Sequence, residues 1–142
     1  KDVAERTAEA VRGALIEGAL PGGGVALLAC RKPLAGRLAA ATGVDERASL
    51  RILLSAVEQP LRTLVSNAGH EPAAVMAALD DAGPGFGLDV VSGRIVDMAR
   101  AGVLDSASVQ KAAVWRAVTG AALALTTDVL VHHKNPAKEF NP

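Results

Sequence analysis

Alanine and leucine dominate the apolar residues of this chain, and they limit most strongly what it can fold into. The sequence has 142 residues, of which 50% are hydrophobic, and it contains 29 alanines and 17 leucines. These are the best helix formers among apolar residues, whereas β-branched residues are in the minority. With one Trp, two Phe and no Tyr, the core must be built from small side chains that let helices approach closely. We therefore predict a mainly α-helical fold.

The charge balance and the scarcity of aromatic residues argue against nucleic acid as a partner. Lys and Arg number 15, as do Asp and Glu, whereas nucleic-acid binding depends on clustered cations and aromatic platforms. No apolar run reaches the roughly 20 residues of a membrane span. The single cysteine, Cys30, cannot form an internal disulfide, which suits a reducing compartment. We therefore expect a cytoplasmic protein that contacts neither nucleic acid nor membrane.

Hydrophobic periodicity and helix breakers divide the chain into segments. Helices are expected over residues 2–17, over 25–30 and 34–41 with Pro33 kinking or splitting the element, over 45–67 with Asp45 as N-cap and an interruption at Pro60, over 72–81 beginning at Pro72, and over 107–126. Residues 88–96 predict a small β-hairpin that turns at Ser92 and Gly93, and residues 128–132 predict a C-terminal strand. Residues 135–142 are polar and are expected to form a mobile tail.

The first chemical candidate is the run Pro21-Gly22-Gly23-Gly24, which precedes a predicted helix. Glycines let a backbone approach a phosphate closely, and a helix N-terminus offers unpaired N–H groups. The alternative is a tight turn between two helices. The run lacks the lysine and the spacing of a phosphate loop, so the residues alone favour the structural interpretation.

Asp105 and Cys30 each allow a functional and a structural interpretation. Asp105 stands just before the helix predicted over 107–126, where a carboxylate would bind a ribose hydroxyl or cap the helix, and capping is the commoner use. Cys30 lies among apolar residues with no histidine close in the sequence, so we expect a core residue and not a nucleophile. No metal site is predicted, because no set of ligands shows a suitable spacing.

Short motifs distributed along nearly the whole chain resemble those of one protein family. They lie, in order, at residues 10–27, 56–62 (AVEQPLR), 67–72 (NAGHEP), 85–87 (GFG), 102–105 (GVLD) and 120–128 (GAALALTTD). Their order and spacing resemble the group I chaperonins, the GroEL type of bacteria, in the C-terminal half of the equatorial domain. The chain is therefore identified as a divergent member of that family.

The resemblance implies a helical equatorial-domain fragment. Residues 1–134 would form the C-terminal part of that domain, with residues 1–17 returning from the intermediate domain. The absence of an initiator methionine before Lys1 suggests a piece cut from a larger subunit. The family's phosphate loop, magnesium-binding aspartate and client-binding apical domain would then lie elsewhere, and this fragment alone would not be an enzyme.

The resemblance also implies a function and partners. The full-length family member binds ATP or ADP with magnesium, assembles into homo-oligomeric rings and folds unfolded client proteins, with a co-chaperonin as a possible further partner. Because half of the domain would be missing, apolar faces should be exposed and the fragment should self-associate, through the hairpin at 88–96 or the strand at 128–132.

Five residues correspond to the family's nucleotide site. Gly23 matches the glycine whose backbone approaches the nucleotide, and Asp105 matches the aspartate that binds the ribose. Val103 matches an apolar residue beneath the base. Asp89 and Val90 stand where the family usually has Asn and Ala against the adenine. An ionised Asp89 would only accept hydrogen bonds, whereas an amide both donates and accepts.

The family's catalytic aspartate, which orients the water that attacks the γ-phosphate, corresponds to Arg6. A guanidinium cannot accept a proton or hold a water by acceptance. We therefore expect ATP hydrolysis to be lost or weak. The alternative function is an oligomerisation or scaffold module that keeps the equatorial fold without turning over ATP.

Overall fold

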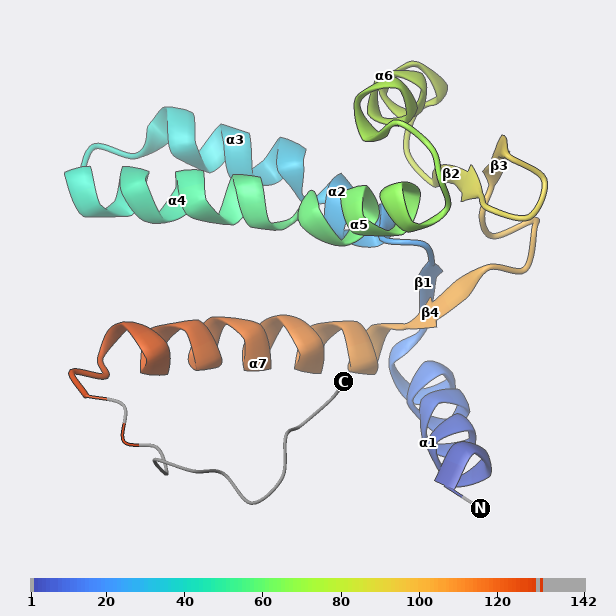
Figure 1. The fold of residues 1–142 in the computed structure, drawn as a ribbon, viewed down its shortest axis with the longest axis horizontal. Coiled ribbons are helices and arrows are strands. Elements are labelled where there is room, and N and C mark those ends of the chain that lie inside the picture. The colour runs from blue at the N-terminus through green and yellow to red at the C-terminus, as the bar shows by residue number, and fades with distance from the viewer. Residues whose placement is uncertain (1, 130, 132–142) are drawn as a thin grey trace. The chain divides into compact units, whose positions relative to one another are not determined.

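The computed structural model describes residues 2–129 and 131 of the chain (Figure 1). In order, its elements are α1 (Asp2–Glu17), β1 (Ala19–Pro21), α2 (Val25–Ala29), α3 (Arg31–Ala40), α4 (Val44–Ala56), α5 (Gln59–Asn67), α6 (Pro72–Ala82), β2 (Phe86–Asp89), β3 (Arg94–Asp97), β4 (Leu104–Ser106) and α7 (Ala107–Leu125). The contacts divide the chain into two units, Lys1–Val109 and Gln110–Pro142. The prediction of a mainly α fold is confirmed.

The helix boundaries follow the glycines and prolines closely. Helix α1 ends before Gly18, which adopts a positive φ of 93° that only glycine tolerates readily. Pro60 lies in the first turn of α5, and Pro72 is the first residue of α6. Proline fits both places because the first N–H groups of a helix have no intrahelical acceptor. The predicted interruption at Pro60 and start at Pro72 are thus confirmed.

Two predictions at helix ends were wrong. The second helical segment is split, which was one of the two expected outcomes, but the break falls at Cys30 and not at Pro33. Pro33 lies in the first turn of α3, where its missing N–H costs nothing. Asp45 is not the N-cap of α4. That position belongs to Gly43, and Asp45 lies inside the first turn, where its negative charge still favours the positive end of the helix dipole.

The prediction that Cys30 belongs to the core was also wrong, because its side chain is exposed. Val25 is buried, with 4% of its surface exposed, and Leu28 packs against the core cluster. These two residues are three positions apart and share one face of α2, whereas Cys30 turns away from that face. Its thiol donates a 3.5 Å hydrogen bond to the carbonyl oxygen of Ala26. The apolar neighbours in the sequence therefore did not indicate burial.

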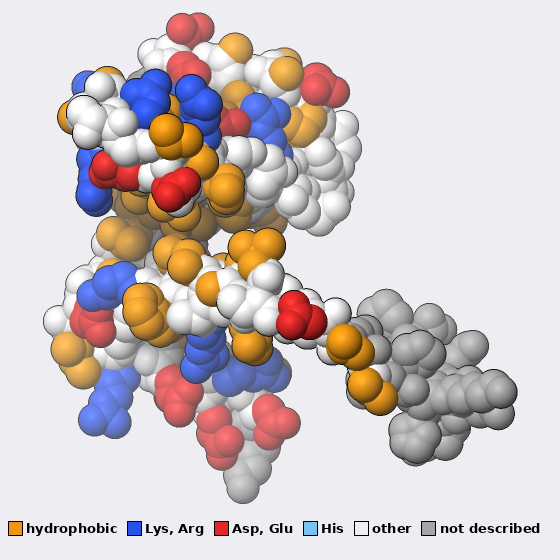
Figure 2. Space-filling view, turned by 90° about the vertical axis from the view of Figure 1, so that its left-hand side faces the viewer, with side chains coloured by type: hydrophobic (Ala, Val, Ile, Leu, Met, Phe, Trp, Pro, Cys, Tyr) orange, Lys and Arg blue, Asp and Glu red, His pale blue; other side chains and the backbone are white. Residues whose placement is uncertain are grey.

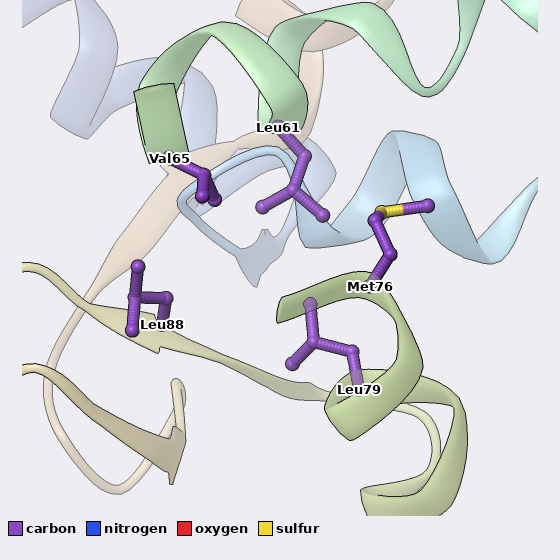
Figure 3. Close-up of a cluster of buried hydrophobic side chains, with 5 residues drawn as sticks. All are labelled: Leu61, Val65, Met76, Leu79 and Leu88. Atoms are coloured by element: carbon purple, nitrogen blue, oxygen red, sulfur yellow. The ribbon is translucent and has the colours of Figure 1, made fainter. Parts of the chain in front are cut away.

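A compact cluster of buried side chains holds α5, α6 and β2 together. It comprises Leu61, Val65, Met76, Leu79 and Leu88, with exposed fractions between 1% and 7% (Figure 3). Leu61 and Val65 are four residues apart on α5, so they lie on one helical face. In Figure 3 they point toward Leu79 of α6 and Leu88 of β2. This cluster fixes the position of the β2–β3 hairpin relative to α5 and α6.

Two short antiparallel sheets complete the first unit. β2 pairs with β3, with Phe86 opposite Asp97 and Asp89 opposite Arg94, which confirms the predicted hairpin. β1 pairs with β4, with Leu20 opposite Asp105 and Pro21 opposite Leu104. This second sheet joins segments more than 80 residues apart in the sequence and was not predicted.

The strand predicted over 128–132 is not found in the described residues of that segment. Residues 128, 129 and 131 are not assigned to a strand, and residues 130 and 132 lie outside the described residues, as does the predicted tail at 135–142. β-rich composition alone does not form a strand where no partner strand supplies hydrogen bonds.

Helix α7 contributes most of its length to the second unit. From Gln110 to Leu125 it carries mostly apolar side chains, and Val114, Trp115, Leu123 and Leu125 are exposed. No described helix is both long and apolar enough to cross a membrane. On the face of the molecule shown in Figure 2, apolar side chains lie among cationic and anionic ones.

Candidate nucleotide-binding site

The glycine run forms a tight turn between β1 and α2. The N–H of Gly22 donates to the carbonyl oxygen of Val103 at 2.9 Å. Gly23 and Gly24 have positive φ angles of 69° and 80°. A Cβ built on Gly24 would lie 2.9 Å from the backbone nitrogen of Leu61, and one on Gly23 would lie 2.8 Å from Cε of Met98. A structural role for this turn is therefore supported, although it joins a strand to a helix and not two helices: Gly23 and Gly24 both adopt a positive φ, and the backbone of Leu61 leaves no room for a side chain at Gly24.

The β1–β4 pairing brings the end of the chain's first unit to this turn. β4 begins directly after Val103, and its residue Asp105 is half-buried opposite Leu20. The pairing therefore holds the glycine turn beside Val103, although the two lie far apart in the sequence.

A pocket of about 240 Å³ opens beside the turn. Its lining consists of Gly23, Leu61, Leu64, Val65, Leu88, Asp89, Val90, Val91, Met98 and Val103. Gly23, Asp89, Val90 and Val103, which belong to the five predicted binding residues, are all in this lining. Asp105, the fifth, is not. The walls are almost entirely apolar, which suits a flat ligand held by burial with a few polar contacts for orientation.

The carboxylate of Asp89 also closes the turn of the β2–β3 hairpin. Its Oδ1 accepts the N–H of Val91 at 3.0 Å, and its Oδ2 accepts the hydroxyl of Ser92 at 2.6 Å. The Ser92 hydrogen bond, followed by that of Val91, holds the pKa of Asp89 below its usual value. Asp89 is therefore ionised at neutral pH and presents only acceptors.

Arg6 does not line this pocket. It lies on α1, where residues 2–9 are all exposed and Ala10 is half-buried. The Nε of Arg6 donates to the carbonyl oxygen of Asp2, one turn earlier on the same helix, at 3.3 Å. As far as the structure describes the pocket, its lining includes no residue of α1. The correspondence of Arg6 to a catalytic position thus remains a prediction.

Several lining residues were missed as site residues. Leu61, Leu64 and Val65 lie in the helix predicted over 45–67 and were not singled out, and Met98 lies in a turn with no periodic signal. These side chains form the floor of the pocket and belong to the core or border it. A site wall built from core residues carries no sequence signal that separates it from ordinary packing.

A second cavity, of about 270 Å³, lies beside an ion-pair cluster that was also not predicted. Arg31 contacts Asp80 at 2.6 Å and Glu58 at 3.3 Å, and Glu58 also pairs with Arg62 at 3.0 Å. The hydrogen bond to Asp80 raises the pKa of Arg31, and burial opposes this effect. The charge of Asp80 and the contact with Glu58 raise the pKa further. The cluster links the start of α3 to α5 and α6.

The described residues contain no group of three or more His, Cys, Asp or Glu side chains that would hold a metal ion.

Comparison with known proteins identifies the family. Residues 1–135 match the model of the TCP-1/cpn60 chaperonin family. The chain is 41% identical over 128 residues to chaperonin GroEL 1 of Polaromonas naphthalenivorans (strain CJ2), covering 89% of this chain and 23% of that protein.

Solved chaperonin structures share the fold. A group III chaperonin in the open state superposes with a TM-score of 0.76 at 26% identity, covering 84% of this chain and 25% of that one. The open-state monomer of a group II chaperonin from Methanococcoides burtonii gives a TM-score of 0.71 at 24% identity, covering 77% and 28%. The chain spans about a quarter of the length of these relatives. The motifs, the family match and the shared fold together show that this chain belongs to the TCP-1/cpn60 chaperonin family.

Proposed function

We propose that this chain forms a nucleotide-binding and ring-forming part of a chaperonin subunit whose role is ATP-dependent protein folding. The observation that carries the proposal is the convergence of Gly23, Asp89, Val90 and Val103 on one apolar pocket. These residues come from a turn, a hairpin and the segment before β4, so their sequence positions alone do not bring them together. A pocket that gathers residues corresponding to a family's base-binding positions is the natural place for a nucleotide base.

The chemistry of the pocket fits a base and a sugar. Val90 and Val103 offer apolar contact to the faces of a flat ring, and Gly23 of the glycine turn forms part of the pocket wall. Asp105 stands two residues beyond Val103, in β4 opposite Leu20, and its carboxylate would accept hydrogen bonds from ribose hydroxyls. ATP or ADP with magnesium is accordingly the cofactor that we propose for the full-length protein.

Hydrolysis of ATP is proposed to be lost or weak. The guanidinium of Arg6, at the position that corresponds to the family's catalytic aspartate, cannot accept a proton or orient a water by acceptance. Its Nε already donates to the backbone of its own helix. Because Arg6 stands in place of the catalytic aspartate, the alternative function is a scaffold or oligomerisation module that keeps the equatorial fold without ATP turnover.

Partners and location follow from the family role and belong to this proposal. The subunits would assemble into homo-oligomeric rings, bind unfolded proteins through parts outside this chain, and act in the cytoplasm, with a co-chaperonin as a possible cap. The exposed apolar residues Val114, Trp115, Leu123 and Leu125 of α7 support burial against another surface in an assembly.

The test uses the natural full-length protein. Isothermal titration with ATP and ADP should show binding, whereas steady-state ATP hydrolysis should be at or near background. Arg6→Asp should raise hydrolysis at least tenfold, since a positioned acceptor for the attacking water contributes about 10² to 10⁴ in rate. Arg12→Asp is the matched control, because Arg12 is exposed on the same helix, and it should leave hydrolysis unchanged.

The outcomes separate the two functions. Rings that bind no nucleotide would overturn the nucleotide-binding proposal and favour the scaffold. A natural protein that hydrolyses ATP at a rate that falls when Arg6 is replaced would contradict the assignment of Arg6 as the cause of lost turnover.

A further inference from the structure

The walls of the pocket beside the glycine turn offer a ligand apolar contact and little else. In the lining that the structure describes, Asp89 is the only charged residue, and the others are Gly23 and eight apolar residues, Leu61, Leu64, Val65, Leu88, Val90, Val91, Met98 and Val103. Such walls bind a flat ring by burying its faces. Apolar contact of this kind discriminates only weakly between rings of similar size and shape.

Asp89 uses its polar atoms to close the hairpin that carries it. Its Oδ1 accepts the N–H of Val91 and its Oδ2 accepts the hydroxyl of Ser92, so both carboxylate oxygens are held by its own turn. Its backbone carbonyl oxygen accepts the N–H of Gly93 at 2.8 Å. No other side chain in the described lining carries an N–H or O–H donor or an oxygen acceptor. The pocket therefore has no side chain set aside to read the edge of a base.

The pocket is open to solvent on one side. Four of its lining residues are between 37% and 93% exposed, namely Leu64, Val90, Val91 and Val103. A purine carries its hydrogen-bonding groups on its edges, and burying such groups without partners is costly. A base in this pocket is therefore expected to place its faces against the apolar walls and to keep its hydrogen-bonding edge in water at the mouth.

We propose that this pocket holds a base by its faces alone and therefore accepts adenine and guanine nucleotides with similar affinity. The inference rests on the proposed nucleotide-binding function and specifies its ligand class as purine nucleotides, which include ATP and ADP. A bidentate pair to a base edge discriminates by roughly 5- to 150-fold in affinity. Without such a pair, ADP, GDP and purine riboside diphosphate, which lacks the 6-amino group of adenine, should bind within about fivefold of one another.

The experiment is a calorimetric titration of these three diphosphates, each with magnesium, into the natural full-length protein and two variants. Leu64→Ala removes part of the apolar wall at a position on α5 that is 45% exposed. It should weaken the binding of all three ligands by the same factor, at least about threefold, because each loses the same apolar contact. Ile52→Ala is the matched control, since Ile52 is an exposed aliphatic residue on α4 outside the pocket, and it should change none of the three affinities.

Failure of this inference is distinguishable from failure of the proposed function. If any two of the ligands differ by more than about fivefold in affinity for the natural protein, the base edge is read and the inference is refuted while nucleotide binding stands. The inference is also refuted if Leu64→Ala weakens one ligand and not the others, or weakens none. If no nucleotide binds to the natural protein, the proposed function itself fails. Similar affinities that Leu64→Ala lowers together and Ile52→Ala leaves unchanged support the inference.

Discussion

Replacement of Gly24 by alanine should destabilise the protein strongly. Gly24 has a φ of 80°, a conformation in which an L-residue costs roughly 1–2 kcal/mol. Its added Cβ would lie 2.9 Å from the nitrogen and 3.0 Å from the Cα of Leu61. Leu61 is a core residue on α5 whose backbone cannot move without disturbing the buried cluster.

The size of the expected loss in stability combines the cost of the positive φ with the cost of the close contact to Leu61. Overpacking against a fixed backbone costs about 1–3 kcal/mol, and alanine recovers about 0.4–1 kcal/mol by restricting the unfolded chain. The net loss for Gly24→Ala is therefore about 1–5 kcal/mol. Gly36→Ala is the matched control, since Gly36 lies inside α3 with nothing within 4 Å of an added Cβ, and it should stabilise by up to about 1 kcal/mol.

Urea denaturation followed by far-ultraviolet circular dichroism measures both changes. We expect a lower denaturation midpoint for Gly24→Ala and an equal or higher midpoint for Gly36→Ala. A Gly24→Ala variant as stable as the wild type would refute it, because neither the positive φ nor the approach to Leu61 would then constrain this position.

Three further changes test other parts of the structure. Leu61→Ala should cost about 2–5 kcal/mol in denaturation experiments, because Leu61 is 2% exposed in the core cluster; a loss below about 1 kcal/mol would contradict its assigned burial. Arg31→Met should cost at most about 1 kcal/mol, since the pairs with Asp80 and Glu58 are partly exposed, and the loss should shrink in high salt. The pKa of Asp89 is lowered in the folded state, so its ionised carboxylate stabilises the fold above the unfolded pKa, and this stabilisation is lost as pH falls through the folded pKa. Asp89→Asn should therefore reduce the free energy of unfolding more at neutral pH than in strong acid. Equal effects at the two pH values would count against this role.

The sequence predicted the helices because periodicity, glycine and proline act locally. Pro72 begins α6 and Gly18 follows α1, as their backbone preferences require. The β2–β3 hairpin was found for the same reason, since its turn residues lie beside its strands in the sequence. Such features need no knowledge of distant parts of the chain.

Long-range features were missed. β1 and β4 are three residues each, too short to show alternation, and their pairing depends on segments far apart in the sequence. Cys30 was placed in the core because its neighbours are apolar, whereas helical geometry turns it outward. Hydrophobic composition alone does not define which face of a short helix is buried.

The candidate site was predicted only in part. Gly23, Asp89, Val90 and Val103 were selected through the family resemblance, and the pocket that they line is a property of the tertiary structure. Leu61, Leu64 and Val65 had no signal that separates a binding wall from a helix core. The paired strands and the glycine turn supply the geometry that the residue pattern lacked.

The most direct test of the central claim is to fill the pocket and measure nucleotide binding. Val103→Trp places a large ring at a lining position that is 37% exposed, so the fold can accommodate it at the mouth of the pocket. Ile52→Trp is the control, because Ile52 is 69% exposed on α4 outside this pocket. We predict that calorimetric titration of the natural full-length protein shows nucleotide binding for the wild type and for Ile52→Trp and at least tenfold weaker binding for Val103→Trp, with unchanged circular dichroism. Undiminished binding by a folded Val103→Trp variant would contradict the assignment of this pocket as the nucleotide site.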